Sequence, residues 1–331
     1  MAKCSYQKLK LLYLMELFLK NTDEAHYITM PQIIQALESY GIRAERKSIY
    51  TDIEALRQYG LDIIAEKKDI NYYYYIGSRQ FELVELKLLM DAVQSAKFIT
   101  PKKSKELLHK LEQLSSKHQA QQLRKEVSIF QRNKTINESI YYNVDQLHEA
   151  IKSDCQIQFQ YFQWNVDKEM VLRKNGAFYS VSPFALTWDD ENYYLIGFDC
   201  ESQKMKHYRV DKILHISLCA QKREGKDIFS SFHLAEYAKK VFHMYGGEEQ
   251  GVTMEVENSL AGVMIDRFGQ EVNLQKLNET HCLVYVHVAL SPQFIAWVIS
   301  LGTGVKIIGP EAVVDMMQNR IKELKTQYSL S

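Results

Sequence analysis

Apolar residues recur every three or four positions in three stretches near the start of the chain. This spacing is typical of helices that bury one face, and it predicts helices over residues 7–20, 29–41 and 45–59. Thr29 is suited to cap the start of the second helix, and Gly41 is suited to end it. The third helix is expected to bury one apolar stripe against the other two.

A predicted hairpin follows the third helix. Residues 61–65 and 72–76 have the composition of strands, and residues 66–71 form a charged turn between them. The second strand holds four consecutive tyrosines, of which alternate ones must face the core because side chains alternate across a strand. Three short helices with a tight turn before the third, followed by a hairpin, predict a winged helix-turn-helix over residues 1–78.

The pattern changes after the hairpin. Helical spacing returns from residue 81 to about residue 130 and predicts a helical linker over residues 79–142. Short strand patterns then predict a small β-barrel of the SH3/Sm-like type over residues 143–222. A helix at 144–153 is expected to precede five strands at residues 156–164, 169–174, 177–187, 192–198 and 205–218.

The last part of the chain, residues 223–331, alternates strands and helices. Strands are expected at 252–256, 272–277, 283–288 and 305–308, and helices at 260–268, 292–301 and 312–327. This order predicts a ferredoxin-like α+β domain. The fold class predicted for the whole chain is therefore multidomain α+β.

The overall charge gives no support to a nucleic-acid partner. The 331 residues hold 41 Lys or Arg and 41 Asp or Glu, so any basic surface must be local. One basic stretch runs from Lys97 to Lys134, where ten Lys or Arg stand against three Glu, although solvated helix faces give the same pattern. The five cysteines are scattered, which favours a reducing, cytoplasmic location over a disulfide framework or a zinc site.

Several classes of protein are disfavoured. No apolar run reaches the roughly 18 residues of a membrane span, and Glu16 interrupts the run at residues 8–19 that imitates a signal peptide. No nucleotide-binding glycine loop, His-Glu-x-x-His or Gly-x-Ser-x-Gly motif occurs. His281 and His287 share one side of a predicted strand but lack a third metal ligand. The sequence therefore predicts no enzyme, no cofactor and no metal site.

The third predicted helix carries long polar side chains opposite its apolar stripe. A helix that reads DNA needs such a face, because Arg binds guanine through two hydrogen bonds while Lys and hydroxyl groups suit phosphates. Basic residues in the hairpin would add a second contact with phosphate or the minor groove. The candidate DNA-binding residues are Arg43, Arg46, Lys47, Ser48, Tyr50, Thr51, Arg57, Lys67 and Lys68. An ordinary exposed helix is the alternative interpretation.

The stretch RKSIYTDIEALRQYGLDI resembles the recognition helix and following turn of the WYL-domain family of transcriptional regulators. Arg46 and Lys47 stand where that family has basic residues. Thr51 stands where relatives often have Arg, which removes one phosphate contact and leaves the operator preference open.

A second resemblance lies in the predicted barrel, where SPFALTWDDENYYLIGFD and KHYRVDKI are similar to strands of the WYL domain itself. The matching residues are Pro183, Leu186, Tyr194, Leu195, Tyr208, Arg209, Asp211 and Ile213. Tyr193 replaces the signature Trp, and Lys206 and Lys212 replace Arg, which keeps the charge but loses the planar fork. The end of the chain loosely resembles the WCX-type extension that commonly follows a WYL domain.

The resemblance implies that the barrel senses a ligand. The candidate effector-binding residues are Tyr161, Ser182, Tyr194, Lys206, His207, Arg209 and Lys212. Their aromatic faces and donors suit a nucleotide or a single-stranded nucleic acid. Strand alternation places Arg209 outward beside Tyr194, where its removal is expected to cost little stability. In the alternative interpretation Tyr161 and Tyr208 are core residues of the barrel, and Lys206 and Lys212 are solvated.

These observations predict a homodimer that binds a double-stranded DNA operator, with the barrel and the C-terminal domain setting its affinity in response to a ligand. An RNA-binding or scaffold protein without operator specificity is the alternative.

Overall fold

The computed structural model describes residues 9–127, 134–189, 191–230, 242 and 247–329. Parts of three predicted features lie outside the described residues: positions 7–8 of the first helix, 128–133 of the basic stretch, and 231–241 and 243–246 of the C-terminal domain. The chain divides into two compact units, residues 1–136 and 137–331. Both units combine helices with antiparallel sheet, so the protein is multidomain α+β. The finer division into four domains stays a prediction.

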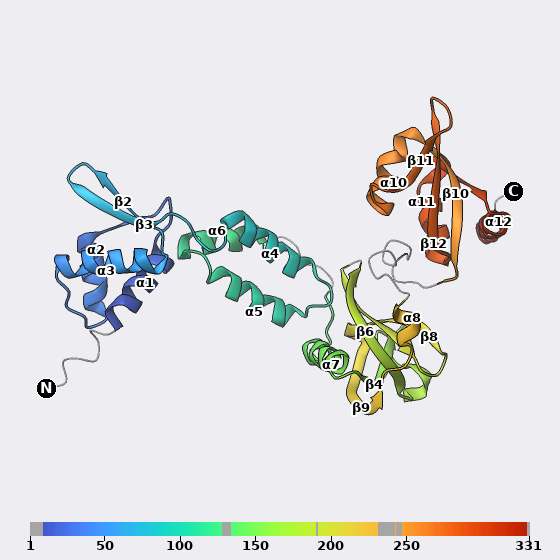
Figure 1. Ribbon diagram of the computed structural model, residues 1–331, viewed down its shortest axis with the longest axis horizontal. Helices are drawn as coiled ribbons and strands as arrows, with labels where there is room; N and C mark the ends of the chain where they lie inside the picture. Colours follow the sequence, from blue (N-terminus) through green and yellow to red (C-terminus); the bar gives the residue numbers. More distant parts are fainter. Residues whose placement is uncertain (1–8, 128–133, 190, 231–241, 243–246, 330–331) are drawn as a thin grey trace. The chain divides into compact units, whose positions relative to one another are not determined.

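Unit 1 begins with three helices and a three-stranded sheet (Figure 1). The elements are α1 (Lys10–Asn21), β1 (Ile28–Thr29), α2 (Met30–Ser39), α3 (Arg46–Tyr59), β2 (Ile63–Lys68) and β3 (Asn71–Ile76). β3 pairs antiparallel with both other strands. One core joins helices and sheet and includes Leu14, Phe18, Ile33, Ile53 and Tyr74. β1 was not predicted, because two residues are too few to show alternation.

The orientation of α3 is set by its buried stripe. Ile49, Ile53 and Leu56 are all buried, as their spacing predicts. The helix ends at Gly60, whose φ of 110° is a left-handed conformation that glycine adopts without steric cost. Because one stripe is fixed against the core, the opposite face of α3 turns toward solvent.

The hairpin is longer and its turn tighter than the sequence predicts. β2 continues through Lys68, and only two residues, Asp69 and Ile70, separate it from β3. Asp69 has a φ of 55°, which Asp tolerates better than most residues. The predicted turn over residues 66–71 was too long because only Ile63 of β2 is buried, so the rest of the strand shows no apolar alternation.

Three helices complete unit 1, namely α4 (Leu83–Ser95), α5 (Pro101–Glu112) and α6 (Lys117–Val127). Their shared core is small and centres on Leu86, Met90 and Leu123. The two apolar stripes of the predicted linker correspond to α4 and α5. The polar sequence of α6 gives a weak apolar pattern, and the sequence did not predict it as a separate helix.

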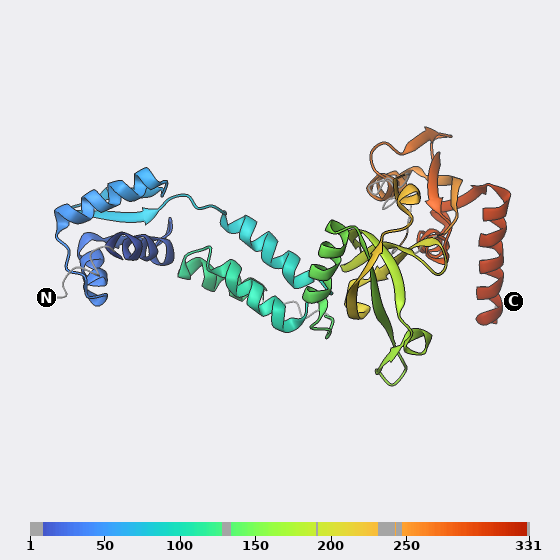
Figure 2. The ribbon, with the colours of Figure 1, turned by 60° about the horizontal axis from the view of Figure 1, so that its bottom comes forward.

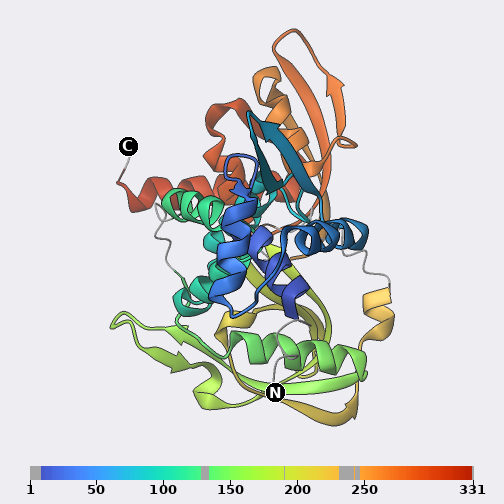
Figure 3. The same cartoon turned by 90° about the vertical axis from the view of Figure 1, so that its left-hand side faces the viewer.

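Unit 2 begins with α7 (Ile140–Lys152), which packs against a curled antiparallel sheet (Figure 3). The strands of this half-barrel are β4 (Cys155–Trp164), β5 (Met170–Leu172), β6 (Tyr179–Asp189), β7 (Asn192–Asp199), β8 (Lys204–Arg209) and β9 (Ile213–Lys222). The order is β5-β4-β6-β7-β8, and β9 pairs with β4. The hairpin of β4 and β5 extends from the sheet (Figure 2). Between β5 and β6, Arg173–Gly176 form a short 3₁₀ turn.

The single strand predicted over residues 205–218 is wrong. β8 pairs with β7, whereas β9 pairs with β4, and a 3₁₀ turn at Val210–Lys212 lets the chain change partners. The turn is buried, so its carbonyl groups need donors. Asn143 and Asn137 supply them, since their side-chain amides donate to carbonyl oxygens of residues 210, 211 and 213. Those donors lie some 70 residues earlier in the sequence, and strand propensity alone could not reveal the break.

The second half of unit 2 begins with α8 (Lys226–Ser230). A four-stranded antiparallel sheet follows, with strand order β11-β12-β10-β13. Its elements are β10 (Glu249–Glu257), α10 (Ala261–Phe268), β11 (Asn273–Lys276), β12 (His281–Ala289), α11 (Pro292–Ser300), β13 (Val305–Gly309) and α12 (Glu311–Gln327), with short 3₁₀ turns at Asn258–Leu260 and Gly302–Gly304. A core of sheet and helix residues includes Met254, Val284, Phe294 and Val313. This element order agrees with the sequence, while the ferredoxin-like name stays a prediction.

Candidate nucleic-acid interface and ligand site

The outward face of α3 carries two basic side chains at its start. Arg46 and Lys47 are exposed, and within the part of the chain that the structure describes neither makes a side-chain hydrogen bond or ion pair. Arg43 is exposed in the loop that precedes the helix. Arg46 and Lys47 can therefore reach a partner without first breaking an internal contact.

Two hydroxyl residues predicted to contact DNA are already engaged. Ser48 is half-buried and accepts a hydrogen bond from the Lys10 ammonium group, which also forms a 2.7 Å ion pair with Asp52. These contacts turn Ser48 toward α1. Thr51 is exposed, but its hydroxyl donates to the Lys47 carbonyl at 3.2 Å, so only its acceptor capacity is left.

The two other predicted contacts of α3 are tied to the sheet. The Arg57 Nε donates to the Ile63 carbonyl at 2.7 Å, and the same guanidinium pairs with Glu54. Tyr50 is 45% exposed and hydrogen-bonds Tyr74. Burial and this tyrosine pair together raise the pKa of Tyr74 to about 12. Arg57 thus holds the end of α3 against the start of β2 and is a structural residue in this conformation.

The hairpin presents one unpaired and one paired lysine. Lys67 is exposed and, among the described residues, makes no side-chain hydrogen bond or ion pair. Lys68 forms a 3.1 Å ion pair with Glu66 and lies 4.5 Å from the centroid of the Tyr27 ring. The hydrogen bond from Lys68 to Glu66 raises the pKa of Lys68. Lys67 is therefore the better phosphate contact of the two.

The interior of the half-barrel is a cluster of aromatic rings. Phe159 stacks on Tyr179 at 5.6 Å and meets Tyr208 edge-on at 5.2 Å, while Tyr161 meets Tyr208 at 5.8 Å. Burial raises the pKa of Tyr161, whose hydroxyl oxygen accepts the Arg209 backbone N–H at 3.1 Å. Most of the Tyr161 ring is therefore core, as the alternative interpretation of the sequence held.

Asp199 anchors this cluster from inside the barrel. Its buried carboxylate accepts hydrogen bonds from the Tyr208 hydroxyl at 2.6 Å and from the Ser202 hydroxyl at 2.8 Å, and it pairs with the Lys206 ammonium at 3.1 Å. Although burial raises the pKa of Asp199, the donors from Tyr208, Ser202 and Lys206 lower it below its usual value. Lys206, predicted to bind an effector, is thus engaged in the protein.

Asp199→Asn is expected to remove part of the acid sensitivity of the barrel. A carboxyl group whose folded pKa lies below its unfolded pKa stabilises the fold above about pH 4, and this contribution is lost as the pH falls below that value. The variant should lose about 1–3 kcal/mol at pH 7 and show a shallower decline of stability from pH 5 to pH 3. Chemical unfolding at several pH values measures both. Asp167→Asn, in an exposed turn, is the control; an unchanged pH slope in Asp199→Asn would contradict the assignment.

Arg209 lies where the sequence places it but is not free. It is the cross-strand partner of Tyr194. Its guanidinium binds Asp211 through two hydrogen bonds, Nε to Oδ1 at 3.0 Å and Nη2 to Oδ2 at 2.8 Å. Asp211 is 4% exposed and the Arg209 side chain 32% exposed, so Arg209 is not the freely exposed residue on which the predicted small cost of its removal depends. Without Arg209 a buried carboxylate would lose its partner.

Two further cations lie near Arg209. Burial lowers the pKa of Lys212, and the charges of Arg209 and Arg173 add to this effect while Asp211 opposes it. Arg173 is exposed in the turn after β5, and among the described residues neither Arg173 nor Lys212 makes a side-chain hydrogen bond or ion pair. Lys212 thus lies near two other cations and a single carboxylate, an arrangement that favours an anion. Arg173 was missed because it lies outside both stretches that resemble the family.

The other predicted effector-binding residues lie at different depths. Ser182 is fully buried, and its hydroxyl accepts the Glu224 backbone N–H at 2.9 Å, so it has no surface to offer a ligand. His207 is half-buried on β8, opposite Ile196 of β7. The structure therefore brings together Tyr161, Tyr194, Arg209 and Lys212, adds Arg173, and places Ser182 in the core.

The fold and these surfaces define a multidomain protein that begins with three helices and a hairpin and contains a half-barrel with a cluster of cations. Two family models match the chain: the WYL domain over residues 142–218 and the WCX domain over residues 248–325. The chain therefore contains a WYL domain followed by a WCX domain. The first match covers most of α7 and the half-barrel, and the second covers the four-stranded sheet and most of α12.

Solved structures resemble this chain only loosely. Proteasome accessory factor B/C (PafBC) of Arthrobacter aurescens is 16% identical over 96% of this chain and 48% of that chain, with a TM-score of 0.30. A CRISPR Cas-related protein is 11% identical over 99% of this chain and 81% of that chain, with a TM-score of 0.39. This chain spans about half the length of PafBC. No curated protein matches it. The domain assignment therefore depends on the two family models.

No helix among the described residues is long and apolar enough to cross a membrane.

Proposed function

We propose that this protein is a sequence-specific DNA-binding transcriptional regulator. The observation that carries the proposal is the outward face of α3, where Arg46 and Lys47 are exposed and uncommitted while the opposite stripe is buried. The β2–β3 hairpin adds Lys67, which is exposed and makes no side-chain hydrogen bond or ion pair among the described residues. A helix that offers Arg and Lys to solvent, together with a hairpin that offers an unpaired Lys, suits base edges and phosphates together. The matches to the WYL and WCX domain models also support this function.

The half-barrel is proposed to set operator affinity in response to an anionic ligand. Arg173, Arg209 and Lys212 supply positive charge, and Tyr161 and Tyr194 lie beside Arg209. A phosphate-bearing ligand, such as a nucleotide or the end of a single-stranded nucleic acid, would relieve the repulsion among these cations. The proposal includes no catalytic step, cofactor or metal.

The regulator is further proposed to act as a cytoplasmic homodimer. One small head buries too little DNA surface for tight binding, whereas two heads related by a two-fold axis suit the half-sites of a palindromic operator. The four cysteines among the described residues are all free thiols, in keeping with a reducing compartment.

Selection of duplexes from fragmented genomic DNA tests the function. The purified full chain is incubated with the fragments at about 0.15 M salt, and the retained duplexes are sequenced. An enriched motif with two half-sites about one or two helical turns apart is the expected result. Retention of DNA without any enriched motif, or of RNA in preference to duplex DNA, would instead favour the RNA-binding or scaffold alternative.

A duplex that carries the enriched motif is called the selected duplex below. Lys67→Ala is expected to weaken binding about equally on the selected duplex and on random DNA. Lys67 has no internal partner, and a phosphate contact carries no sequence information. The slope of the logarithm of affinity against the logarithm of salt concentration should become shallower by roughly one. Fluorescence anisotropy over a salt series measures this slope. Lys105→Ala, an exposed lysine on α5, should leave it unchanged; a change confined to the selected duplex would show that Lys67 reads bases instead.

A further inference from the structure

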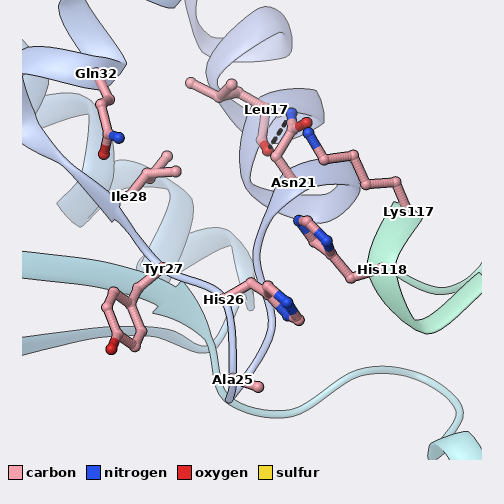
Figure 4. A pocket seen from close by; sticks show the side chains of 9 residues that line it. All are labelled: Leu17, Asn21, Ala25, His26, Tyr27, Ile28, Gln32, Lys117 and His118. Carbon is pink, nitrogen blue, oxygen red and sulfur yellow. Dashed lines mark hydrogen bonds between the residues drawn. The ribbon is translucent and has the colours of Figure 1, made fainter. Parts of the chain in front are cut away.

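A pocket in unit 1 is lined by none of the residues proposed to contact DNA (Figure 4). It has a volume of about 530 Å³ and is walled by the end of α1, the segment through β1, the start of α2 and the start of α6. The polar residues that line it are Asn21, His26, Tyr27, Gln32, Lys117 and His118. None of its nine lining residues is acidic, and Lys117 contributes a positive charge.

One side of the pocket is fixed by a buried carboxylate. Asp23 is 3% exposed and accepts hydrogen bonds from the Ser116 hydroxyl, from the Ala25 backbone N–H at 3.0 Å, and from His26 Nδ1 at 2.7 Å. Burial raises the pKa of Asp23, but these donors lower it further than burial raises it. Asp23 therefore stays ionised, holds a proton on His26 Nδ1 and leaves Nε2 of the ring free to face away.

His118 stacks directly on this ring. The two imidazole centroids are 3.7 Å apart and the ring planes differ by 2°, so protonation of both rings would place two like charges in contact. Burial lowers the pKa of His118, and the positive charges of His26 and Lys117 add to this effect while Asp23 opposes it. Arg79 is a further cation near Asp23, but its guanidinium already donates to the carbonyls of Leu19 and Thr22.

The remaining donors are available to a ligand. Among the described residues Lys117 makes no side-chain hydrogen bond or ion pair. The side-chain carbonyl oxygen of Gln32 accepts hydrogen bonds from the backbone N–H and the hydroxyl of Thr29, which leaves the amide N–H groups of Gln32 for the pocket. No group of three or more His, Cys, Asp or Glu side chains in the described part of the chain is arranged to hold a metal ion. The Asp23 carboxylate is already engaged by three donors, so the charge of Lys117 is left for an anion.

We propose that this pocket binds an oxyanion of the phosphate class, held by Lys117 and His118 and completed by the amide of Gln32. The anion bridges the α1–α2 segment and α6, so it tightens the packing between the DNA-binding head and the linker helices. Two sources can supply it: a free phosphate or phosphate ester, or a backbone phosphate of bound duplex. Only the second source rests on the proposed function.

The test is a proton titration of the histidine rings in the full chain. Protein labelled with ¹⁵N only in histidine is titrated from pH 5 to pH 8.5 in chloride, in inorganic phosphate at equal ionic strength, and with the selected duplex. His118→Gln and His26→Gln assign the signals. A bound oxyanion favours the charged ring, so the pKa of His118 should rise by roughly one unit in phosphate or with duplex. The rise should vanish in Lys117→Gln and persist in Lys105→Gln.

The arms of the experiment separate the outcomes. A rise in phosphate identifies a free oxyanion, and a rise with duplex alone identifies a backbone phosphate. An unchanged pKa of His118 in both media overturns the proposal. Anisotropy on the same samples reports duplex binding independently, so a protein that binds no DNA can still bind phosphate here, and one that binds DNA can still lack the site.

Discussion

Arg46→Ala is expected to lower the affinity for the selected duplex by about ten- to a hundredfold, which corresponds to roughly 1–3 kcal/mol. Arg46 lies in the first turn of α3, is exposed and has no internal partner, so its guanidinium can bind a guanine edge through two hydrogen bonds. Because this contact reads a base, the loss should be large on the selected duplex and small on random DNA. Anisotropy titrations on both duplexes measure the difference.

Lys47→Ala and Arg57→Ala are informative comparisons for this result. Lys47 is as exposed as Arg46, but an ammonium suits phosphate, so its removal should weaken binding to both duplexes alike. The Arg57 guanidinium already donates to the Ile63 carbonyl and pairs with Glu54, so its removal should lower the unfolding temperature more than it changes base preference. If Arg46→Ala and Lys47→Ala both leave affinity and salt dependence unchanged, α3 is not the helix that reads DNA.

The sequence predicts the elements of the head well because burial there is one-sided. α2 and α3 each bury one stripe, and the period of that stripe is visible in residues such as Ile33, Ile49 and Ile53. Prediction fails where burial gives no signal: β2 extends to Lys68 with only Ile63 buried, and α6 is almost wholly polar. In both places long-range packing decides the structure, and local patterning carries little information.

The candidate sites show a second limit of the sequence. Periodicity correctly assigns Arg46 and Lys47 to exposed positions, but it does not reveal which polar side chains already have partners within the fold. Lys10 engages Ser48, and Asp199 engages Lys206, across separations that only the folded chain brings together. The same limit hides Arg173, which approaches Lys212 only because β5 and β9 both pair with β4.

This distinction decides how the proposed sensor should be tested. Arg209 is held by Asp211, a buried carboxylate, so Arg209→Ala is expected to cost about 1–3 kcal/mol of stability before any ligand is considered. A lost ligand response in that variant would have two explanations, namely the loss of a ligand contact and the destabilisation of the half-barrel. Arg173 and Lys212 carry the same charge near the same point without an internal partner, and their removal separates ligand binding from folding.

The double variant Arg173→Gln/Lys212→Gln is therefore expected to remove the effect of a phosphate-bearing ligand on DNA binding, while unfolding temperature and basal operator affinity stay close to those of the unchanged protein. Removing two of the three cations takes away most of the attraction for an anion, and Lys212, whose pKa burial and Arg209 already lower, is released from an unfavourable position. Anisotropy with the selected duplex, titrated with short single-stranded oligonucleotides and cyclic nucleotides, measures the response. Lys204→Gln, an exposed lysine at the far end of β8, is the control and should respond fully. Equal responses of the double variant and the control to every ligand that binds would place the sensor elsewhere and leave the half-barrel with a structural role.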